Sequence, residues 1–303
     1  MVKSFGFLSA LQRERLTHRP PVPPLCLDPK CKARPMKQVL CKDPYTQRQV
    51  LMHYPYLANS TLFYLHEVAH DKYTPPINYG LRVGFVLLSR QSPGVMNVLW
   101  GLHERLKMVQ GKCLAFFGLT GLIEKNYIEI TDENLELFLN QGGCELTGRS
   151  TSHCLGSVEN QEAVRQRCEE LMLDGLVMPG SAFAMSEAAL VAEYFLARQC
   201  RTSIIGIPAT GSNNLAGEFI ETCVGFDSST KVYAALIGNV LTDAASMPKY
   251  WHFIRLMGRQ PSFEVRFPTR LMLPSIAMLL EGAFGSSYTF LNFLGDCLCM
   301  RLR

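Results

Sequence analysis

The fold is decided by two stretches, LDGLVMPG (Leu173–Gly180) and IIGIPATGSNNL (Ile204–Leu215). Each begins as a short apolar strand and ends in a turn, and the residues between them predict a helix over 186–199. A strand that leads through a tight turn to a helix start is how doubly wound sheets hold phosphates. Yet these turns contain no acid and no Lys. They therefore predict a phosphate-binding scaffold that lacks phosphate-transfer chemistry.

The same alternation extends outward from these two stretches. Apolar runs predict further strands over 81–88, 112–117 and 250–257. Helical spacing or a start signal predicts a helix opening at Pro93, one over 158–172 with its apolar side including Met172, and one over 227–245 capped by Asp227. This order predicts an α/β fold with a doubly wound, mainly parallel sheet. Residues 1–80 are rich in Pro and predict an irregular N-terminal arm.

Composition excludes several classes of protein. The chain has 303 residues, of which 48% are hydrophobic and 18% are charged, and its net charge of +4 is spread along the sequence. This pattern argues against nucleic-acid binding. Eleven cysteines without paired spacing predict reduced thiols and a cytoplasmic protein. The apolar stretch 271–300 has its longest uncharged run at 282–295, which is shorter than the ~20 residues that a membrane span needs.

Three further segments are candidates for binding phosphate. Ser89 and Arg90 follow a predicted strand and precede a helix, where backbone N–H groups meet anions. Arg149 follows the Gly-rich turn 140–143, and a guanidinium in that setting can hold a phosphate bidentately. The strand 250–257 leads into Met257-Gly258-Arg259, and the ends of strands form the usual ligand edge of an open sheet. The alternative at each of these places is an ordinary surface turn.

Taken together, the motifs resemble the pyrophosphate-dependent phosphofructokinase family over about residues 5–262. The turn SRQSPG (Ser89–Gly94) and NVLWGL (Asn97–Leu102) are most similar to the α, regulatory, subunit of heteromeric members. The resemblance also includes NQGG (140–143), LDGLV (173–177), VGFD (224–227), IGNV (237–240) and RLMGR (255–259). It implies three regions: an arm at 1–80, a phosphofructokinase-like domain at 81–262 and a divergent apolar tail at 263–303.

The family transfers phosphate from pyrophosphate to fructose 6-phosphate with Mg²⁺, and the resemblance implies that this chain has lost that chemistry. Acids, a Lys and a base of the family are replaced by Ala182, Phe183, Ala209 and Ser212. No catalytic residue, metal or cofactor is therefore expected in this chain. The family's phosphate turn corresponds to Gly180. The family's sugar-phosphate contacts correspond to residues that are kept, namely Lys249, Tyr250, Met257, Gly258 and Arg259.

The sequence thus predicts a regulatory or catalytically degenerate protein of glycolysis, which works with a catalytic phosphofructokinase chain or as a homo-oligomer. Two alternatives stay open. The first is an active 6-phosphofructokinase, using pyrophosphate or ATP, in which another acid such as Glu187 serves as a metal ligand. The second is a scaffold partner that binds no small molecule. The family continues for about another half-chain beyond residue 262, so either the chain is a short isoform or its reading frame departs from the family's.

Overall fold

The computed structural model describes residues 13–14, 17–19, 32–36, 43–60, 62–66, 80–88, 93–140, 144–148, 154–215, 220, 222–246, 252–255, 288–292 and 297–301. The chain forms two compact units. The first comprises residues 1–90 and 96–207, and the second comprises residues 91–95 and 208–303.

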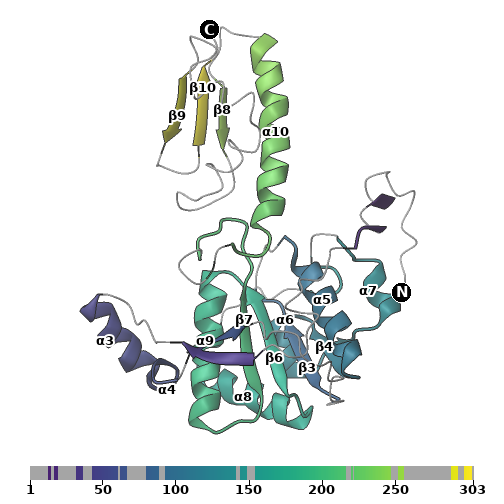
Figure 1. Ribbon diagram of the computed structural model, residues 1–303, viewed down its shortest axis with the longest axis vertical. Helices are drawn as coiled ribbons and strands as arrows, with labels where there is room; N and C mark the ends of the chain where they lie inside the picture. Colours follow the sequence, from purple (N-terminus) through teal and green to yellow (C-terminus); the bar gives the residue numbers. More distant parts are fainter. Residues whose placement is uncertain are drawn as a thin grey trace. The chain divides into compact units, whose positions relative to one another are not determined.

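The first unit is built on a five-stranded sheet (Figure 1). The strand order is β5-β4-β3-β6-β7, with β3 parallel to both β4 and β6 and with β5 antiparallel at one edge. The strands are β3 (Arg82–Val86), β4 (Lys112–Phe116), β5 (Tyr127–Glu129), β6 (Gly175–Gly180) and β7 (Ser203–Pro208). This arrangement confirms the predicted α/β fold with a mainly parallel sheet.

Helices cover both faces of the sheet. The helices of this part are α5 (Val95–Met108), α6 (Gly118–Glu124), α7 (Asp132–Glu136), α8 (Val158–Glu170) and α9 (Ala182–Ala197). Helices α6, α8 and α9 pack together, and the core beneath them takes alternate residues of three strands, such as Val86, Phe116 and Met178. Helix α9 connects β6 to β7 toward one edge of the sheet, and α5 connects β3 to β4 toward the other edge. Because both crossovers are right-handed, α5 lies on the opposite face of the sheet. Central strands buried on both faces explain the nearly continuous apolar runs in the sequence.

The ends of three predicted helices need correction. Helix α5 begins at Val95, and Pro93 lies in the turn before it rather than at its first position. Helix α9 begins at Ala182, four residues before the predicted start. Helix α8 ends at Glu170, and Met172, predicted to face the core, has φ of 52° and is 67% exposed. A left-handed residue reverses the chain, so its side chain leaves the apolar stripe of the helix.

The N-terminal arm contains regular structure, so the prediction of an irregular arm over 1–80 is wrong for its described part. Asp43 accepts a hydrogen bond from the backbone N–H of Thr46 at 2.8 Å and caps the arm helix that begins at Pro44. The carboxylate of Glu193, on α9, accepts the backbone N–H groups of Tyr56 and Leu57, each at 2.8 Å. This carboxylate satisfies donors that the first turn of a helix leaves unpaired. The arm elements are β1 (Lys32–Met36), α3 (Pro44–His53), α4 (Pro55–Ala58) and β2 (Leu62–His66), with β1 and β2 antiparallel.

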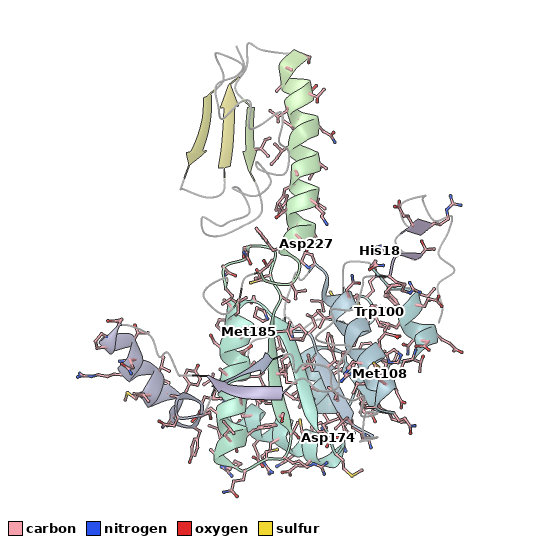
Figure 2. The ribbon with its side chains drawn as sticks, in the orientation of Figure 1. His18, Trp100, Met108, Asp174, Met185 and Asp227 are labelled. Carbon is pink, nitrogen blue, oxygen red and sulfur yellow. The ribbon has the colours of Figure 1, made fainter. Side chains whose placement is uncertain are left out.

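Asp174 holds together the amino-terminal ends of the sheet strands. Its carboxylate accepts the backbone N–H of Arg82, which begins β3, at 2.9 Å. It also accepts the guanidinium of Arg201, which precedes β7, at 2.6 Å. Nearby, the hydroxyl of Thr202 donates to the carbonyl of Leu173 at 2.7 Å. The Leu-Asp-Gly motif therefore joins three strands at the end of the sheet where β6 begins, and Asp174 is labelled there in Figure 2.

Glu162 links α8 to α9. Its carboxylate pairs with the Arg165 guanidinium and accepts the hydroxyl of Tyr194 at 2.7 Å. The Arg198 guanidinium lies 5.0 Å from the centre of the Tyr194 ring, a cation–π contact. The hydrogen bonds from Arg165 and then Tyr194 hold the pKa of the Glu162 carboxyl well below its ordinary range. The pair of helices over the sheet is thus fastened by a charged carboxylate.

The second unit contains the longest described helix, α10 (Phe226–Ser246). The prediction that Asp227 caps this helix is wrong, because Asp227 lies inside the first turn and pairs with Lys231 at 3.5 Å. Gly225 precedes the helix with φ of 95°, and a Cβ there would lie 2.1 Å from the carbonyl oxygen of Pro93. Only glycine fits this turn. A separate antiparallel sheet has the order β8-β10-β9, formed by β8 (His252–Arg255), β10 (Cys297–Arg301) and β9 (Tyr288–Asn292).

The predicted strand over 250–257 is present in its described part, His252–Arg255, and its described partner is β10 of the tail. Across the described ranges, none of the helices combines the length and the apolar character that crossing a bilayer requires. Whether residues 1–80, 81–262 and 263–303 form separate regions stays a prediction.

Candidate functional site

The carboxyl-terminal ends of β3 and β6 lie side by side. The backbone N–H of Leu88, which follows β3, donates to the carbonyl of Pro179 at 3.0 Å. Chain connections leave this strand pair in opposite directions, because β3 leads to β4 on one side and β6 leads to β7 on the other. Open α/β sheets bind their ligands at such a switch point. This edge is therefore the candidate site of the first unit.

Gly180, a predicted phosphate-binding residue, is the buried last residue of β6. A Cβ added at Gly180 would lie 2.3 Å from the Cβ of Ala184 on α9. The glycine is thus required by the close packing of the strand end against the helix. Three other predicted phosphate-binding residues, Ser89, Arg90 and Arg149, lie outside the described residues.

The first turn of α9 carries no charge. Ser181 occupies the N-cap position without a side-chain capping bond, and the turn contains no acidic residue. Ala182 begins the helix, and the Phe183 side chain is 58% exposed. Mg²⁺ takes oxygen ligands, which neither of these side chains offers. The residues at this turn do not fit the metal that the family resemblance implies.

The turn after β7, in the second unit, is closed by hydroxyl and amide groups. Ala209 is fully buried and pairs in parallel with Val224. The hydroxyl groups of Thr210 and Ser212 lie 2.9 Å apart, and the Thr210 hydroxyl also accepts the backbone N–H of Ser212 at 3.2 Å. A hydroxyl whose partner is another hydroxyl gains no basicity, so this geometry does not activate Ser212 as a base.

Glu187, the alternative metal ligand, serves the loop before α8. This residue is 4% exposed, and its carboxylate accepts the backbone N–H of Leu155 at 3.1 Å. The Gln161 side chain donates to the Leu155 carbonyl at 2.7 Å. Both backbone groups of Leu155 are therefore bound by buried side chains. This arrangement argues for a structural role of Glu187 and against the alternative in which it replaces the family's metal-binding acid.

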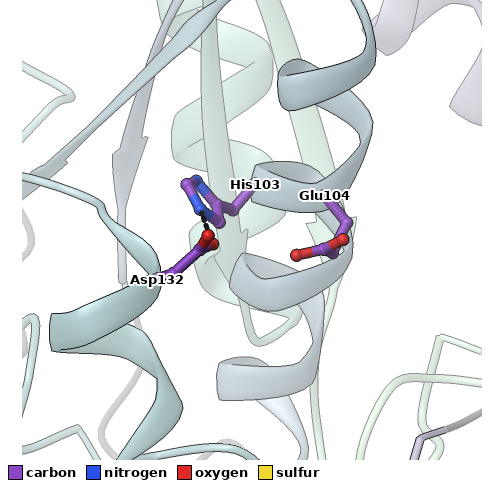
Figure 3. Close-up of side chains that lie close together, drawn as sticks. All are labelled: His103, Glu104 and Asp132. Carbon is purple, nitrogen blue, oxygen red and sulfur yellow. Dashed lines mark hydrogen bonds and ion pairs between the residues drawn. The ribbon is translucent and has the colours of Figure 1, made fainter.

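A second cluster of ionisable groups lies on α5 and α7, and sequence reasoning missed it. The Nε2 atom of His103 lies 2.9 Å from the Asp132 carboxylate (Figure 3). The Lys107 ammonium donates to both carboxylate oxygens of Asp132, at 2.9 and 3.0 Å, and to Glu104 at 3.3 Å. The bond to Asp132 raises the pKa of Lys107, while the bonds from Lys107 and then His103 lower the pKa of Asp132.

His103, Glu104 and Asp132 have metal-binding side chains close enough to share one ion. Lys107, however, already supplies the positive charge between the two carboxylates, so a metal ion would have to displace an ammonium group held by three oxygen contacts. The cluster borders a groove of about 500 Å³, which is also lined by Arg19, Trp100 and Glu136. The spacing of His103, Glu104 and Lys107 on one helix is visible in the sequence. No local sequence pattern predicts that Asp132 is their partner.

The predicted sugar-phosphate residues cannot be placed in this site. Lys249, Tyr250, Met257, Gly258 and Arg259 all lie outside the described residues. The structure describes β8 between them, which ends at Arg255. Their role stays a prediction from the family resemblance.

Comparison with known proteins places these features in context. The sequence profile of the family described as "Phosphofructokinase" matches residues 83–263. The chain is 35% identical over 301 residues to the pyrophosphate–fructose 6-phosphate 1-phosphotransferase subunit alpha 1 of Arabidopsis thaliana, covering 96% of this chain and 49% of the relative. It is 32% identical over 242 residues to the subunit beta of that enzyme in Solanum tuberosum, covering 77% of this chain and 42% of the relative.

The chain spans about half the length of the curated relatives it matches. The family profile ends at residue 263, whereas the match to the Arabidopsis thaliana subunit covers 96% of the chain and so extends beyond it. Among solved structures, the pyrophosphate-dependent phosphofructokinase of Nitrosospira multiformis superposes with a TM-score of 0.55 at 15% identity, covering 65% of this chain and 51% of that one. That likeness supports the fold alone.

Proposed function

The chain belongs to the phosphofructokinase family, and from this premise we propose that it is a catalytically degenerate, regulatory member that binds a sugar phosphate without transferring phosphate. The observation that carries the proposal is the uncharged first turn of α9, with Ala182 and Phe183 where the resemblance implies metal-binding acids. Phosphoryl transfer depends on positioning and on neutralising the charge of the moving group. A turn that offers no acid to hold a metal ion supplies no such neutralisation.

The turn after β7 supports the same conclusion from a separate segment. Ala209 stands where the resemblance implies a Lys. Ser212 stands where it implies a base, and the described partner of its hydroxyl is the hydroxyl of Thr210, which is only weakly basic. Removing a single charge-stabilising group commonly costs an enzyme orders of magnitude in rate. Loss of the acid, the Lys and the base together is therefore expected to abolish turnover.

The first experiment measures phosphorylation of fructose 6-phosphate by the purified chain, with Mg²⁺ and either pyrophosphate or ATP. We expect no turnover above that of a control preparation made from cells with an empty vector. Turnover that requires Mg²⁺ and persists after further purification would contradict the proposal and favour the active-enzyme alternative.

The second experiment tests ligand binding by calorimetric titration of fructose 6-phosphate. A charge-assisted bond from a guanidinium to phosphate is worth roughly 1.5–3 kcal/mol, so Arg259→Ala should weaken binding by about tenfold or more. Arg259→Lys should recover part of the affinity, because Lys keeps the charge without the bidentate geometry. Arg201→Ala, which changes an 86% exposed guanidinium at the amino-terminal end of the first unit's sheet, is the matched control. Equal affinity in wild type and Arg259→Ala would show that Arg259 has only a structural role, and absence of binding in both would favour the scaffold alternative.

We further propose that the chain works with a catalytic phosphofructokinase chain or with copies of itself. The support is that its relatives are named as alpha and beta subunits of one enzyme. The described Cys113, Cys168 and Cys223 are free thiols, which fits a reducing, cytoplasmic setting. Sedimentation of the chain alone and mixed with a beta-type relative tests the assembly. A monomer in both samples, with a sharp melting transition, would contradict it.

A further inference from the structure

Asn140 joins three segments of the first unit. Its side-chain amide nitrogen donates to the carbonyl of His18, in the arm, at 2.6 Å. Its side-chain oxygen accepts the amide of Asn97, on α5, at 2.9 Å, and its backbone N–H donates to the Asn97 side chain at 3.0 Å. Three hydrogen bonds thus connect the arm, α5 and the end of the chain segment that follows α7.

The backbone at this position suits Asn and glycine better than other residues. Asn140 has φ of 55°, in the left-handed region, where Asn is tolerated. It follows Leu139, which is 1% exposed and anchors the segment in the core. Asn140 is therefore held in place by its own segment. Water can replace the arm as the hydrogen-bond partner of its side-chain amide.

The arm also forms one wall of the groove beside α5 and α7. Arg19 lines this groove together with Trp100, and its guanidinium lies 4.0 Å from the Glu136 carboxylate. Both partners of this pair are well exposed, so water screens the pair and it holds the segment only weakly. Figure 2 labels His18 and Trp100 in this part of the unit. Among the described contacts, the bond from Asn140 to His18 is the stronger attachment of the segment 17–19.

We propose that the arm segment 17–19 is a strap that docks on Asn140 and, through Asn97, holds α5 in the position required for sugar-phosphate binding. Asn97 lies in the first turns of α5, and that helix directly follows the predicted phosphate turn at Ser89 and Arg90. This inference rests on the proposed function. Coupling of two sites is reciprocal, so if the docked strap favours the ligand, the ligand must also favour the docked strap.

The strap is tested first without ligand. In a Trp251→Phe background, Trp100 is the remaining tryptophan of the two in the chain, and its emission reports on the groove. Asn140→Gly keeps the left-handed backbone and removes the amide, so we expect a red shift of Trp100 emission and at least fivefold faster trypsin cleavage after Arg13 and Arg15. Met172→Gly places glycine at another left-handed position, an exposed residue just after the end of α8. It should change neither the Trp100 emission nor the rate of cleavage. Equal cleavage in the two variants would overturn the strap.

Coupling is tested with fructose 6-phosphate. We expect a saturating concentration to slow cleavage of the wild-type arm at least fivefold and to have no such effect in Asn140→Gly. Asn140→Asp separates the two links, because a carboxylate still accepts the Asn97 amide but cannot donate to His18, and it should behave like Asn140→Gly. Unchanged affinity with the strap released would overturn this inference and leave the proposed function standing. Absence of wild-type binding would overturn the proposed function and the coupling, while the cleavage comparison would still decide the strap.

Discussion

The two ends of the sheet are built in opposite ways. At the amino-terminal end, the Asp174 carboxylate binds Arg82 and Arg201, and charge and hydrogen bonds join three strands. At the carboxyl-terminal end, Gly180 and Ala184 meet by close apolar packing, and the first turn of α9 carries no acid. The charged contacts of Asp174 thus lie at the end of the sheet away from the first turn of α9, where the family's metal-binding acids belong. Such a chain can keep the fold after losing the reaction, which is why fold alone does not establish activity.

The largest expected effect tests the packed end. In Gly180→Ala, the new methyl group would lie 2.3 Å from the Cβ of Ala184, so strand and helix must move apart. Overpacking of this kind should lower the free energy of unfolding by about 3 kcal/mol. Urea denaturation followed by circular dichroism measures the change.

Gly101→Ala is the matched control for this substitution. Gly101 lies within α5, with no atom inside 4 Å of an added Cβ. Alanine should therefore stabilise the chain by roughly 0.5–1 kcal/mol. Equal effects at Gly180 and Gly101 would show that the strand end is not tightly packed.

The second effect tests the polar end. Asp174→Ala leaves the backbone N–H of Arg82 without its carboxylate and should lower the free energy of unfolding by about 2 kcal/mol. Arg201→Ala removes only the 86% exposed partner and should cost less than about 1 kcal/mol. Comparison of the two urea midpoints decides between them. If both variants lose the same amount, the exposed ion pair rather than the backbone bond holds this end.

The third effect concerns pH and the contact of Glu162 on α8 with Tyr194 on α9. Because the pKa of Glu162 is lowered in the folded chain, its contribution to stability is present above the ordinary carboxyl pKa and is lost as pH falls. Below about pH 5, Glu162→Gln should therefore lose stability less steeply than the wild type. Tyr194→Phe, which removes one donor, should show an intermediate slope. Parallel melting-temperature profiles for all three would rule out this linkage.

The smallest effect returns to the uncharged turn. Phe183→Asp places a carboxylate in the first turn of α9 and should stabilise the helix by about 0.5 kcal/mol through its dipole. Phe183→Asn, similar in size but neutral, should lack this gain. Neither variant should phosphorylate fructose 6-phosphate, because the turn after β7 still lacks a Lys and a base. Turnover in the Phe183→Asp variant would contradict this expectation. It would show that the missing acid alone accounts for the loss of activity.

The strands and most helices could be predicted because their signals are local. Apolar runs buried on both faces identify β3, β4 and β6, and a shorter apolar run identifies β7, which is partly exposed. Ser181 before Ala182 is a usable start signal for α9 that the prediction overlooked. The Asp43-Pro44 pair, an N-cap followed by Pro, is a similar signal for α3. The prediction that Asp227 caps α10 failed because Gly225 allows the helix to begin at Phe226, one residue before Asp227.

The polar contacts around the sheet could not be predicted from the sequence. His103 and Asp132 are 29 residues apart, and nothing local relates them. The role of Glu187 depends on a buried loop backbone at Leu155, which only packing brings near. The absence of oxygen ligands at Ala182 and Phe183 follows from the sequence alone, and what it means for activity stays a prediction.

The Glu193 carboxylate also sets an order of events during synthesis. Its partners Tyr56 and Leu57 precede it by 137 and 136 residues. The ribosome therefore releases the arm long before α9 exists, at a rate of roughly 5–20 residues per second. For that interval, several seconds or more, the donors of α4 can meet only water or another protein. Contacts this distant in sequence also form late in folding, since the loop that they close must lose its freedom first. The arm is thus exposed on the nascent chain, and a chaperone or a neighbouring chain can reach it before its own domain does.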